Sequence, residues 1–162
     1  MLKIWGRKTS SNVQKVLWCC GEVGLAFERV DLGGPFGGNR EPEYLALNPN
    51  GLVPTIEDDG FVLWESNSIV RYLAAKHGSG GLWPTEPRRR ADADRWMDWQ
   101  STTVGPLMVA VFQGLVRTPP EERDAAKIEA TRKDWAASWS ILDAHLADED
   151  YVAGGTFSVA DI

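Results

Sequence analysis

Apolar residues recur along the first half of the chain at two different spacings. Over residues 12 to 22 they stand at i, i+3, i+4 and i+7, the spacing of one face of a helix. Short runs at 2 to 5 and 26 to 31 predict strands, and helical spacing returns from Ser66 to His77. The pattern predicts a small mixed α/β unit over residues 1 to 77.

Helices alone are predicted beyond this unit. Residues 78 to 84 are rich in glycine and predict a linker, and everything from 85 to 162 carries helical spacing. Thr85 is suited to cap a helix with Pro87 in its first turn. That helix is expected to be interrupted at Gly105-Pro106.

A further helix is predicted over about 121 to 147, and most of the eight tryptophans are expected in the core. Its apolar face comprises Ile128, Trp135, Trp139, Leu142 and Leu146.

Residues 53 to 66 combine a bend, a hairpin and a helix start. Pro54 has no N–H and cannot sit quietly in a central strand, and the natural alternative is a bend, for which a cis Val53-Pro54 bond is one possibility. Such a bend turns the N–H and C=O of Val53 outward, where an extended ligand can pair with them. Asp59-Gly60 predicts a tight turn between two strands.

Glu65 and Ser66 follow this hairpin and open the next helix. Free N–H groups at a helix start attract a carboxylate, and an acid beside them accepts from an ammonium. The pair could therefore hold both charged groups of an amino acid. Each residue also has a structural interpretation: Ser66 caps its helix, Glu65 interacts with the helix dipole, and Pro54 shapes a turn.

Taken together with Ser10-Ser11-Asn12 at the start of the first helix, these motifs resemble the glutathione transferase family, over residues 2 to 162. The serine-type, theta/zeta-like bacterial cytosolic members are the most similar. The resemblance implies an α/β thioredoxin-like N-terminal domain with a mixed four-stranded sheet, followed by an all-α helical domain. It also implies glutathione as co-substrate, a hydrophobic electrophile as second substrate, and a homodimer.

Roles in the site follow from the same resemblance. In the family a serine at the first helix contacts the glutathione sulfur, and we assign this role to Ser11, although spacing alone does not separate it from Ser10. The expected glutathione-binding residues are Ser10, Asn12, Arg40, Val53, Pro54, Glu65 and Ser66. The expected electrophile pocket comprises Trp99, Phe112 and Gln113.

One serine suffices for such thiol chemistry. A free thiol has a pKa of about 8.5, and lowering it by roughly two units requires about 2.7 kcal/mol of preference for the thiolate. A hydroxyl that donates to a thiolate contributes about 1.5 to 3 kcal/mol, and a helix N-terminus roughly 0.3 to 1 kcal/mol more. Plain N-capping is the structural alternative for both serines.

The two cysteines argue against thiol-disulfide exchange. Thioredoxin-like oxidoreductases carry a reactive cysteine where the first helix begins, and this chain has serines there. Cys19 and Cys20 lie further along the helix and are expected to be packing residues. A glutaredoxin-like exchanger would need one of them to be reactive, and no metal-ligand spacing surrounds them.

The net charge and the hydropathy of the chain indicate which partners are excluded. A formal charge of -6 and a pI near 4.9 argue against nucleic acid, and the only basic cluster, Arg88 to Arg90, is expected on a solvated helix face. No run of the sequence approaches a membrane span and no signal peptide is recognisable, so we expect a cytoplasmic protein.

The chain ends just after a motif similar to the family's capping box, Ser158 to Asp161. Because helices follow that box in the family, the sequence is expected to be C-terminally truncated, as a fragment or naturally. The alternative to an active enzyme is a noncatalytic protein of the same fold that binds glutathione or other ligands, or serves as an interaction module.

Overall fold

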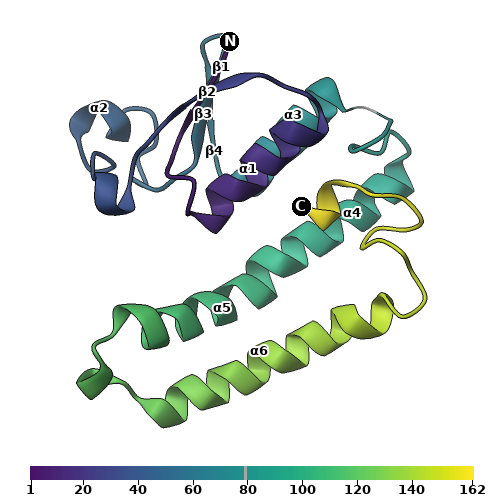
Figure 1. Cartoon of the computed structure of the whole chain (residues 1–162). Helices are drawn as coiled ribbons and strands as arrows, with labels where there is room; N and C mark the ends of the chain where they lie inside the picture. Colours follow the sequence, from purple (N-terminus) through teal and green to yellow (C-terminus); the bar gives the residue numbers. More distant parts are fainter. Residues whose placement is uncertain (79) are drawn as a thin grey trace. The chain divides into compact units, whose positions relative to one another are not determined.

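The computed structural model describes residues 1–78 and 80–162. The chain forms two compact units, one of residues 1–85 with Ile162 and one of residues 86–161. Ser79, within the predicted linker, lies outside the described residues. Each unit has its own arrangement of elements (Figure 1).

One mixed sheet organises the N-terminal unit. Its order is β2-β1-β3-β4; β1 pairs parallel with β2 and antiparallel with β3, and β3 pairs antiparallel with β4. The predicted four-stranded α/β fold is therefore confirmed. The strands are β1 (Leu2–Trp5), β2 (Phe27–Val30), β3 (Thr55–Asp58) and β4 (Phe61–Trp64).

Helices cover both faces of this sheet. α1 (Ser11–Glu22) and α3 (Ser66–His77) lie side by side on one face, and α2 (Pro42–Leu45) lies on the other (Figure 1). Both long helices were predicted from their apolar spacing, and that spacing creates the buried layer between helices and sheet. The fully buried side chains include Ile4, Val13, Val16, Ile56, Ile69, Val70 and Leu73.

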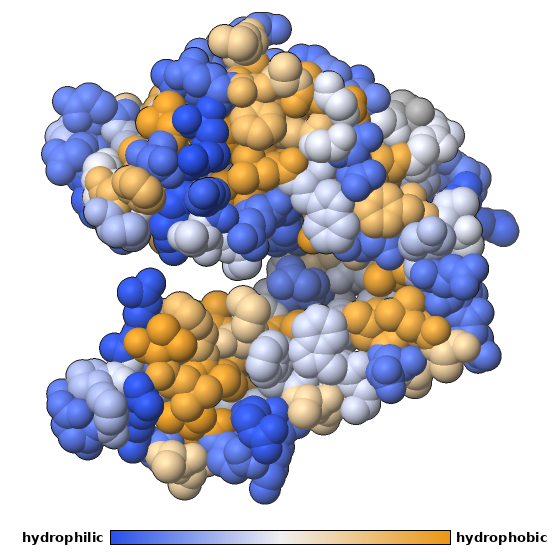
Figure 2. Space-filling model, in the orientation of Figure 1, coloured by the Kyte–Doolittle hydropathy of each residue, from blue (hydrophilic) through white to orange (hydrophobic). Residues whose placement is uncertain are grey.

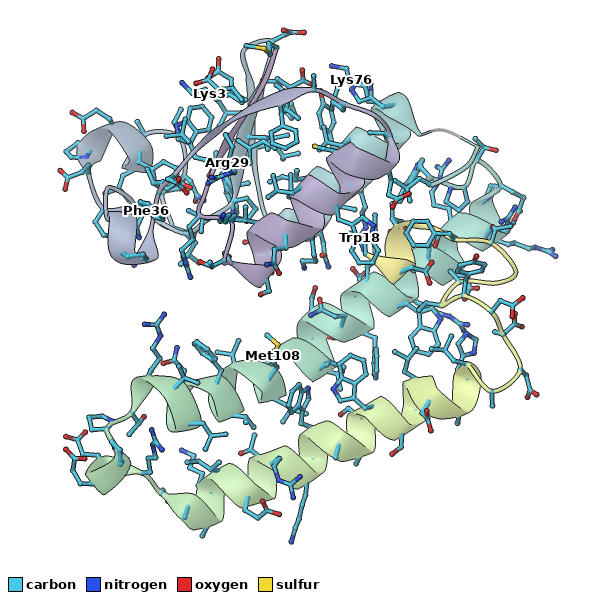
Figure 3. All side chains as sticks on the ribbon, viewed as in Figure 1. Lys3, Trp18, Arg29, Phe36, Lys76 and Met108 are labelled. Carbon is cyan, nitrogen blue, oxygen red and sulfur yellow. The ribbon has the colours of Figure 1, made fainter. Side chains whose placement is uncertain are left out.

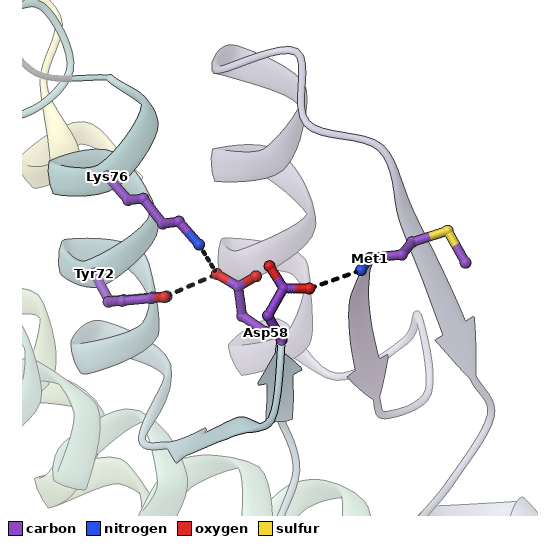
Figure 4. A network of polar contacts seen from close by, with 5 residues as sticks. Met1, Asp58, Tyr72 and Lys76 are labelled. Carbon is purple, nitrogen blue, oxygen red and sulfur yellow. Dashed lines mark hydrogen bonds and ion pairs between the residues drawn. The ribbon is translucent and has the colours of Figure 1, made fainter.

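The turn between β3 and β4 is a two-residue hairpin, as predicted. Asp59 and Gly60 have φ of 51° and 87°, and type I′ turns require positive φ at both positions. Beside the turn, Asp58 Oδ2 accepts from Tyr72 Oη at 2.8 Å and from Lys76 Nζ at 2.7 Å (Figure 4). These bonds fasten the hairpin to α3.

The C-terminal unit is helical. α5 packs along α6, and η5 packs against α4. Its elements are α4 (Pro87–Trp99), the π-helical η2 (Gln100–Val104), α5 (Gly105–Phe112), the π-helical η3 (Gln113–Arg117), the 3-10 turn η4 (Pro120–Glu122), α6 (Ala125–His145) and the 3-10 turn η5 (Val159–Asp161).

Two predictions about helix ends in this unit were wrong. Glu86, not Thr85, caps α4, because its carboxylate accepts from the N–H of Arg88 at 3.0 Å and of Arg89 at 2.8 Å. Gly105-Pro106 does not interrupt the helix. The wider turn of η2 precedes it, so Pro106 falls in the first turn of α5, where a missing N–H costs little.

The expectation that most tryptophans form the core was also wrong. None of the eight is buried: Trp18, Trp64 and Trp139 are 47%, 37% and 43% exposed, and the other five are intermediate. In the described part of α6, Ser138 is the buried residue, and the predicted apolar face is only partly covered. Apolar spacing predicted the helix correctly but not the depth of its burial.

The predicted capping box, Ser158 to Asp161, forms hydrogen bonds among its own residues. The N–H of Ser158 donates to Asp161 Oδ2 at 2.8 Å, and the N–H of Ala160 donates to Ser158 Oγ at 3.2 Å. Asp161 Oδ1 also accepts from the N–H of Val152 at 2.9 Å. The box thus fixes the segment that follows α6.

Candidate functional site

A cavity of about 220 Å³ opens in the N-terminal unit and contains three of the predicted site residues, Ser10, Asn12 and Val53. It joins the start of α1 to the loop before β3. Sequence reasoning missed the other residues that line it: Arg7, Gly33, Gly34, Asn39, Gly51 and Leu52.

At the start of α1, the cavity is lined by a serine whose hydroxyl makes no capping hydrogen bond. Ser10 is the N-cap residue, with φ of -84° and ψ of 124°, yet its side chain makes no capping hydrogen bond. Capping serines normally accept from the second or third N–H of the helix. Ser11 is the first helical residue, is exposed, and does not line the cavity. The free hydroxyl at the cavity therefore belongs to Ser10.

The loop before β3 bends as predicted, with a cis Val53-Pro54 peptide bond and Pro54 buried. In the part of the chain that the structure describes, neither the N–H nor the C=O of Val53 takes part in a backbone hydrogen bond. Both groups can therefore pair with a ligand backbone laid along the cavity.

A buried polar network holds this loop in place. Tyr44 Oη donates to the C=O of Leu52 at 2.6 Å and lies 2.7 Å from Thr55 Oγ1. Asn48 Nδ2 donates to the same C=O at 2.9 Å. Tyr44, Asn48 and Thr55 are at most 3% exposed, and burial raises the pKa of Tyr44. No pattern in the sequence pointed to this network, because Tyr44 in α2, Asn48 in the loop that follows and Thr55 at the start of β3 belong to different segments.

A second uncapped helix start lies nearby, at α3. Its N-cap residue is Glu65 rather than the predicted Ser66, and the Glu65 side chain makes no capping hydrogen bond. Glu65 is exposed and has φ of 74°, a region that residues other than glycine rarely adopt. Buried Ser66 reaches the cavity lining through its Oγ, which lies 3.3 Å from Asn12 Oδ1.

Lys15 links the two helices beside this point. Its ammonium donates to Asn67 Oδ1 at 2.8 Å. Burial lowers the pKa of Lys15 to about 8, although the nearby Glu65 carboxylate opposes the shift. A cation thus stands between α1 and the acid that opens α3.

Arg40 lies at the other end of the cavity but does not line it. It is exposed, and its Nη1 donates to the C=O of Asn50 at 3.2 Å. Its neighbour Asn39 does line the cavity and donates to the C=O of Gly51 at 2.8 Å. Gly51 is required here, since a Cβ would stand 2.7 Å from the Asn39 carbonyl.

The predicted electrophile residues occupy different places within the helical unit. Trp99 lines a cavity of about 290 Å³ with Trp96, and Gln113 lines one of about 330 Å³ between α5 and α6. Phe112 is 43% exposed and lines neither. Figure 2 shows hydrophobic surface over α5 and η3, where Val109, Phe112, Leu115 and Val116 are exposed.

The cysteines do not take part in the site. Cys19 and Cys20 are fully buried in α1, as predicted for packing residues. Burial raises the pKa of Cys19 to about 12 and that of Cys20 to about 11, so neither forms a thiolate near neutral pH.

Neither a metal-binding cluster nor a membrane-spanning helix is found within residues 1–78 and 80–162. No three His, Cys, Asp or Glu side chains there gather closely enough to hold a metal ion. No helix in the same residues is both long and apolar enough to cross a bilayer.

Known proteins match both units. Residues 9–76 match the glutathione S-transferase N-terminal domain, and residues 106–162 match the glutathione S-transferase C-terminal domain. The chain is 48% identical to glutathione S-transferase GstB of Escherichia coli K12, over 100% of the chain and 79% of that protein. It is 37% identical to glutathione S-transferase 3 of Zea mays, over 99% of the chain and 73% of that protein.

Solved structures agree with these sequence matches. A theta class glutathione S-transferase from Xanthomonas axonopodis pv. citri, crystallised with glutathione bound, superimposes with a TM-score of 0.94 at 50% identity. The match covers 99% of this chain and 77% of that one. On the strength of both domain matches and of these relatives, the chain belongs to the glutathione S-transferase family and is a glutathione transferase.

Proposed function

We propose that this transferase binds glutathione along the cavity of its N-terminal unit and activates the thiol with a serine at the start of α1. The observation that carries the proposal is the uncapped hydroxyl of Ser10, which lines the same cavity as Val53. A hydroxyl at a helix start can donate to a thiolate and so favour the ionised form.

The geometry favours Ser10 over Ser11, the residue that we preferred from the sequence. Ser11 is exposed on the first turn of α1 and outside the cavity lining. In this assignment Ser10 is the hydrogen-bond donor to the sulfur and Asn12 is its neighbour in the lining. The serine stays protonated throughout, because the nucleophile is the substrate's own sulfur.

The rest of glutathione has matching groups along the site. The free N–H and C=O of Val53 would pair with the cysteinyl backbone, at the bend that Pro54 creates. The exposed Glu65 carboxylate would accept from the α-ammonium, and the start of α3 at Ser66 would hold the α-carboxylate. Arg40 would reach the glycyl carboxylate.

The reaction then has a simple balance. The bound thiol releases its proton to solvent, and the thiolate attacks an electrophilic carbon. A sulfur–carbon bond forms as the leaving group departs with its electron pair, or as an epoxide or activated alkene opens. For the hydrophobic electrophile we retain Trp99, Phe112 and Gln113 as candidate contacts.

Calorimetric titration of glutathione, paired with single-turnover kinetics, tests this proposal on Ser10→Ala and Ser11→Ala. The two serines are adjacent, so each variant is the matched control of the other. We expect Ser10→Ala to bind glutathione nearly as well as the unmutated chain but to lose about 10- to 100-fold in rate, as expected when a hydrogen bond to a charged sulfur is removed. Equal activity in both variants would contradict serine activation.

The remaining parts of the proposal rest on the family. We propose a homodimer in the cytoplasm, with the glutathione-binding domain at residues 1 to 77, a linker at 78 to 84 and the helical domain at 85 to 162. Light scattering on the purified chain measures the assembly directly. Glutathione binding without turnover of any electrophile would instead favour the noncatalytic alternative.

A further inference from the structure

Arg7 lines the cavity and carries a positive charge, and none of the proposed contacts of glutathione uses this charge. It lies in the turn between β1 and α1, three residues before Ser10, and lines the cavity with it. Backbone bonds fix its position, since its N–H donates to the C=O of Leu32 at 3.0 Å and its C=O accepts from the N–H of Ser10 at 3.1 Å. The backbone of Arg7 is therefore held beside Ser10, the proposed sulfur contact.

Two glycines make room for this side chain. Gly33 and Gly34 have φ of 79° and 58°, and both line the cavity. A Cβ on Gly34 would stand 2.9 Å from Arg7 Cδ and Nε, and a Cβ on Gly33 would stand 3.4 Å from Nη1. The arginine thus extends across bare backbone, most closely at Gly34, where an added Cβ would force the Arg7 side chain to shift.

The nearby acid does not neutralise Arg7. Asp31 follows β2, one residue before Leu32, and binds Arg29 through both carboxylate oxygens. Arg29, labelled in Figure 3, also donates to the C=O of Gly6 at 2.8 Å. In the described part of the chain the Arg7 guanidinium has neither a hydrogen bond nor an ion pair, so its five N–H donors remain available.

We propose that Arg7 selects electrophiles that carry a carboxylate or a similar anionic group. The inference rests on the proposed function, in which Glu65, the start of α3 and Arg40 already match the charged groups of glutathione. Arg7 then faces no charge of the tripeptide. A planar guanidinium with free donors binds a carboxylate through two parallel hydrogen bonds. The second substrate would be steered with its anion at Arg7 and its reactive carbon toward the sulfur.

A matched pair of aryl chlorides tests this selection. 4-Chloro-3-nitrobenzoate and 4-chloro-3-nitrobenzamide have the same leaving group and nearly the same size, and differ in charge. In each, the thiolate forms a bond to the ring carbon, chloride leaves with the bonding electrons, and the thiol proton passes to solvent. Rates are divided by the uncatalysed rate of the same reagent, which removes the difference in intrinsic reactivity.

The variants are Arg7→Gln, Arg7→Lys and Lys8→Gln. Lys8 is exposed and outside the cavity lining, so its substitution removes the same net charge one residue away. We expect Arg7→Gln to lose about 10- to 100-fold in kcat/KM for the benzoate and less than about 2-fold for the benzamide, as for a lost charge-assisted hydrogen bond. Arg7→Lys should fall between, and Lys8→Gln should match the unmutated chain.

A binding measurement separates this proposal from its alternatives. Calorimetry compares glutathione with the two product conjugates, which differ only in carboxylate against carboxamide. Weaker binding of the carboxylate conjugate alone in Arg7→Gln supports the proposal. Equal weakening for glutathione itself would overturn it and assign Arg7 to a glutathione carboxylate, and equal rate losses for both chlorides would assign it to the thiolate. Failure of the unmutated chain to bind glutathione would instead overturn the proposed function.

Discussion

Replacing Glu65 by glycine should stabilise the fold while it weakens glutathione binding. Glu65 has φ of 74° and ψ of 110°, and it follows β4 as the N-cap of α3. Residues held in such backbone regions cost on the order of 1 to 3 kcal/mol. An acid held in this conformation makes structural sense only if its side chain has another use, which in our account is to bind the ammonium of glutathione.

The expected stability gain can be worked out from these terms. Glycine removes a backbone strain of about 1 to 3 kcal/mol. Its greater conformational freedom in the unfolded chain lowers the free energy of unfolding by about 0.5 to 1 kcal/mol. The net gain is about 1 kcal/mol. With an m value of about 2 kcal/mol/M in urea, the unfolding midpoint should rise by about 0.5 M.

The expected loss of binding has the opposite sign. A hydrogen bond to a charged group contributes about 1.5 to 3 kcal/mol, so affinity for glutathione should fall roughly 10- to 100-fold. Calorimetric titration measures the affinity and urea unfolding measures the stability. Glu65→Gln keeps the strained backbone and loses the charge, so it should weaken binding without the gain in stability.

A second glycine substitution serves as the control. Asp59 also has positive φ, of 51°, but lies in the hairpin turn, where its exposed ion pair with the N-terminus contributes little. Asp59→Gly should leave glutathione binding unchanged. If Glu65→Gly bound glutathione as tightly as the unmutated chain, or lowered the urea midpoint, the reasoning about Glu65 would be refuted.

Three further predictions concern the same unit. Tyr44→Phe removes two buried hydrogen bonds and should cost about 1 to 3 kcal/mol and raise KM for glutathione, as seen by thermal unfolding and steady-state kinetics. The pKa of Asp58 is lowered chiefly by its bond to Lys76, so its stabilisation is present above the unfolded pKa of about 3.9 and is lost as pH falls through the folded pKa; acid titration of Asp58→Asn should show no such loss. The pKa of Lys15 is lowered to about 8 by burial, so the unfolded chain binds more protons between pH 8 and about 10.4, and the stability of the unmutated chain should rise relative to Lys15→Met across that window.

Periodicity and turn chemistry were enough to predict most of the N-terminal unit. Apolar spacing placed α1 and α3, and Asp59-Gly60 placed the hairpin, because these signals come from residues adjacent in the sequence. The bend at Pro54 followed from its missing N–H. The resemblance to glutathione transferases then supplied the arrangement of these parts.

Side-chain geometry at the site was beyond the sequence. Whether Ser10 or Ser11 faces the cavity depends on where the backbone enters the helix, and a shift of one residue turns a side chain by about 100°. The network of Tyr44, Asn48 and Thr55 joins the short helix α2, the loop after it and the start of β3, so no periodic signal within one segment predicts it. The burial of tryptophans was overestimated, since helical spacing says which face is apolar and not how much of it is covered.

The pKa of the bound glutathione thiol tests the central claim most directly. Ultraviolet absorbance of the thiolate, followed against pH at saturating glutathione, gives this pKa in the unmutated chain, Ser10→Ala and Ser11→Ala. We predict a value well below the free thiol's pKa of about 8.5 in the unmutated chain and in Ser11→Ala, and a return toward about 8.5 in Ser10→Ala. A lowered pKa that persists in Ser10→Ala would contradict activation of the thiol by this serine.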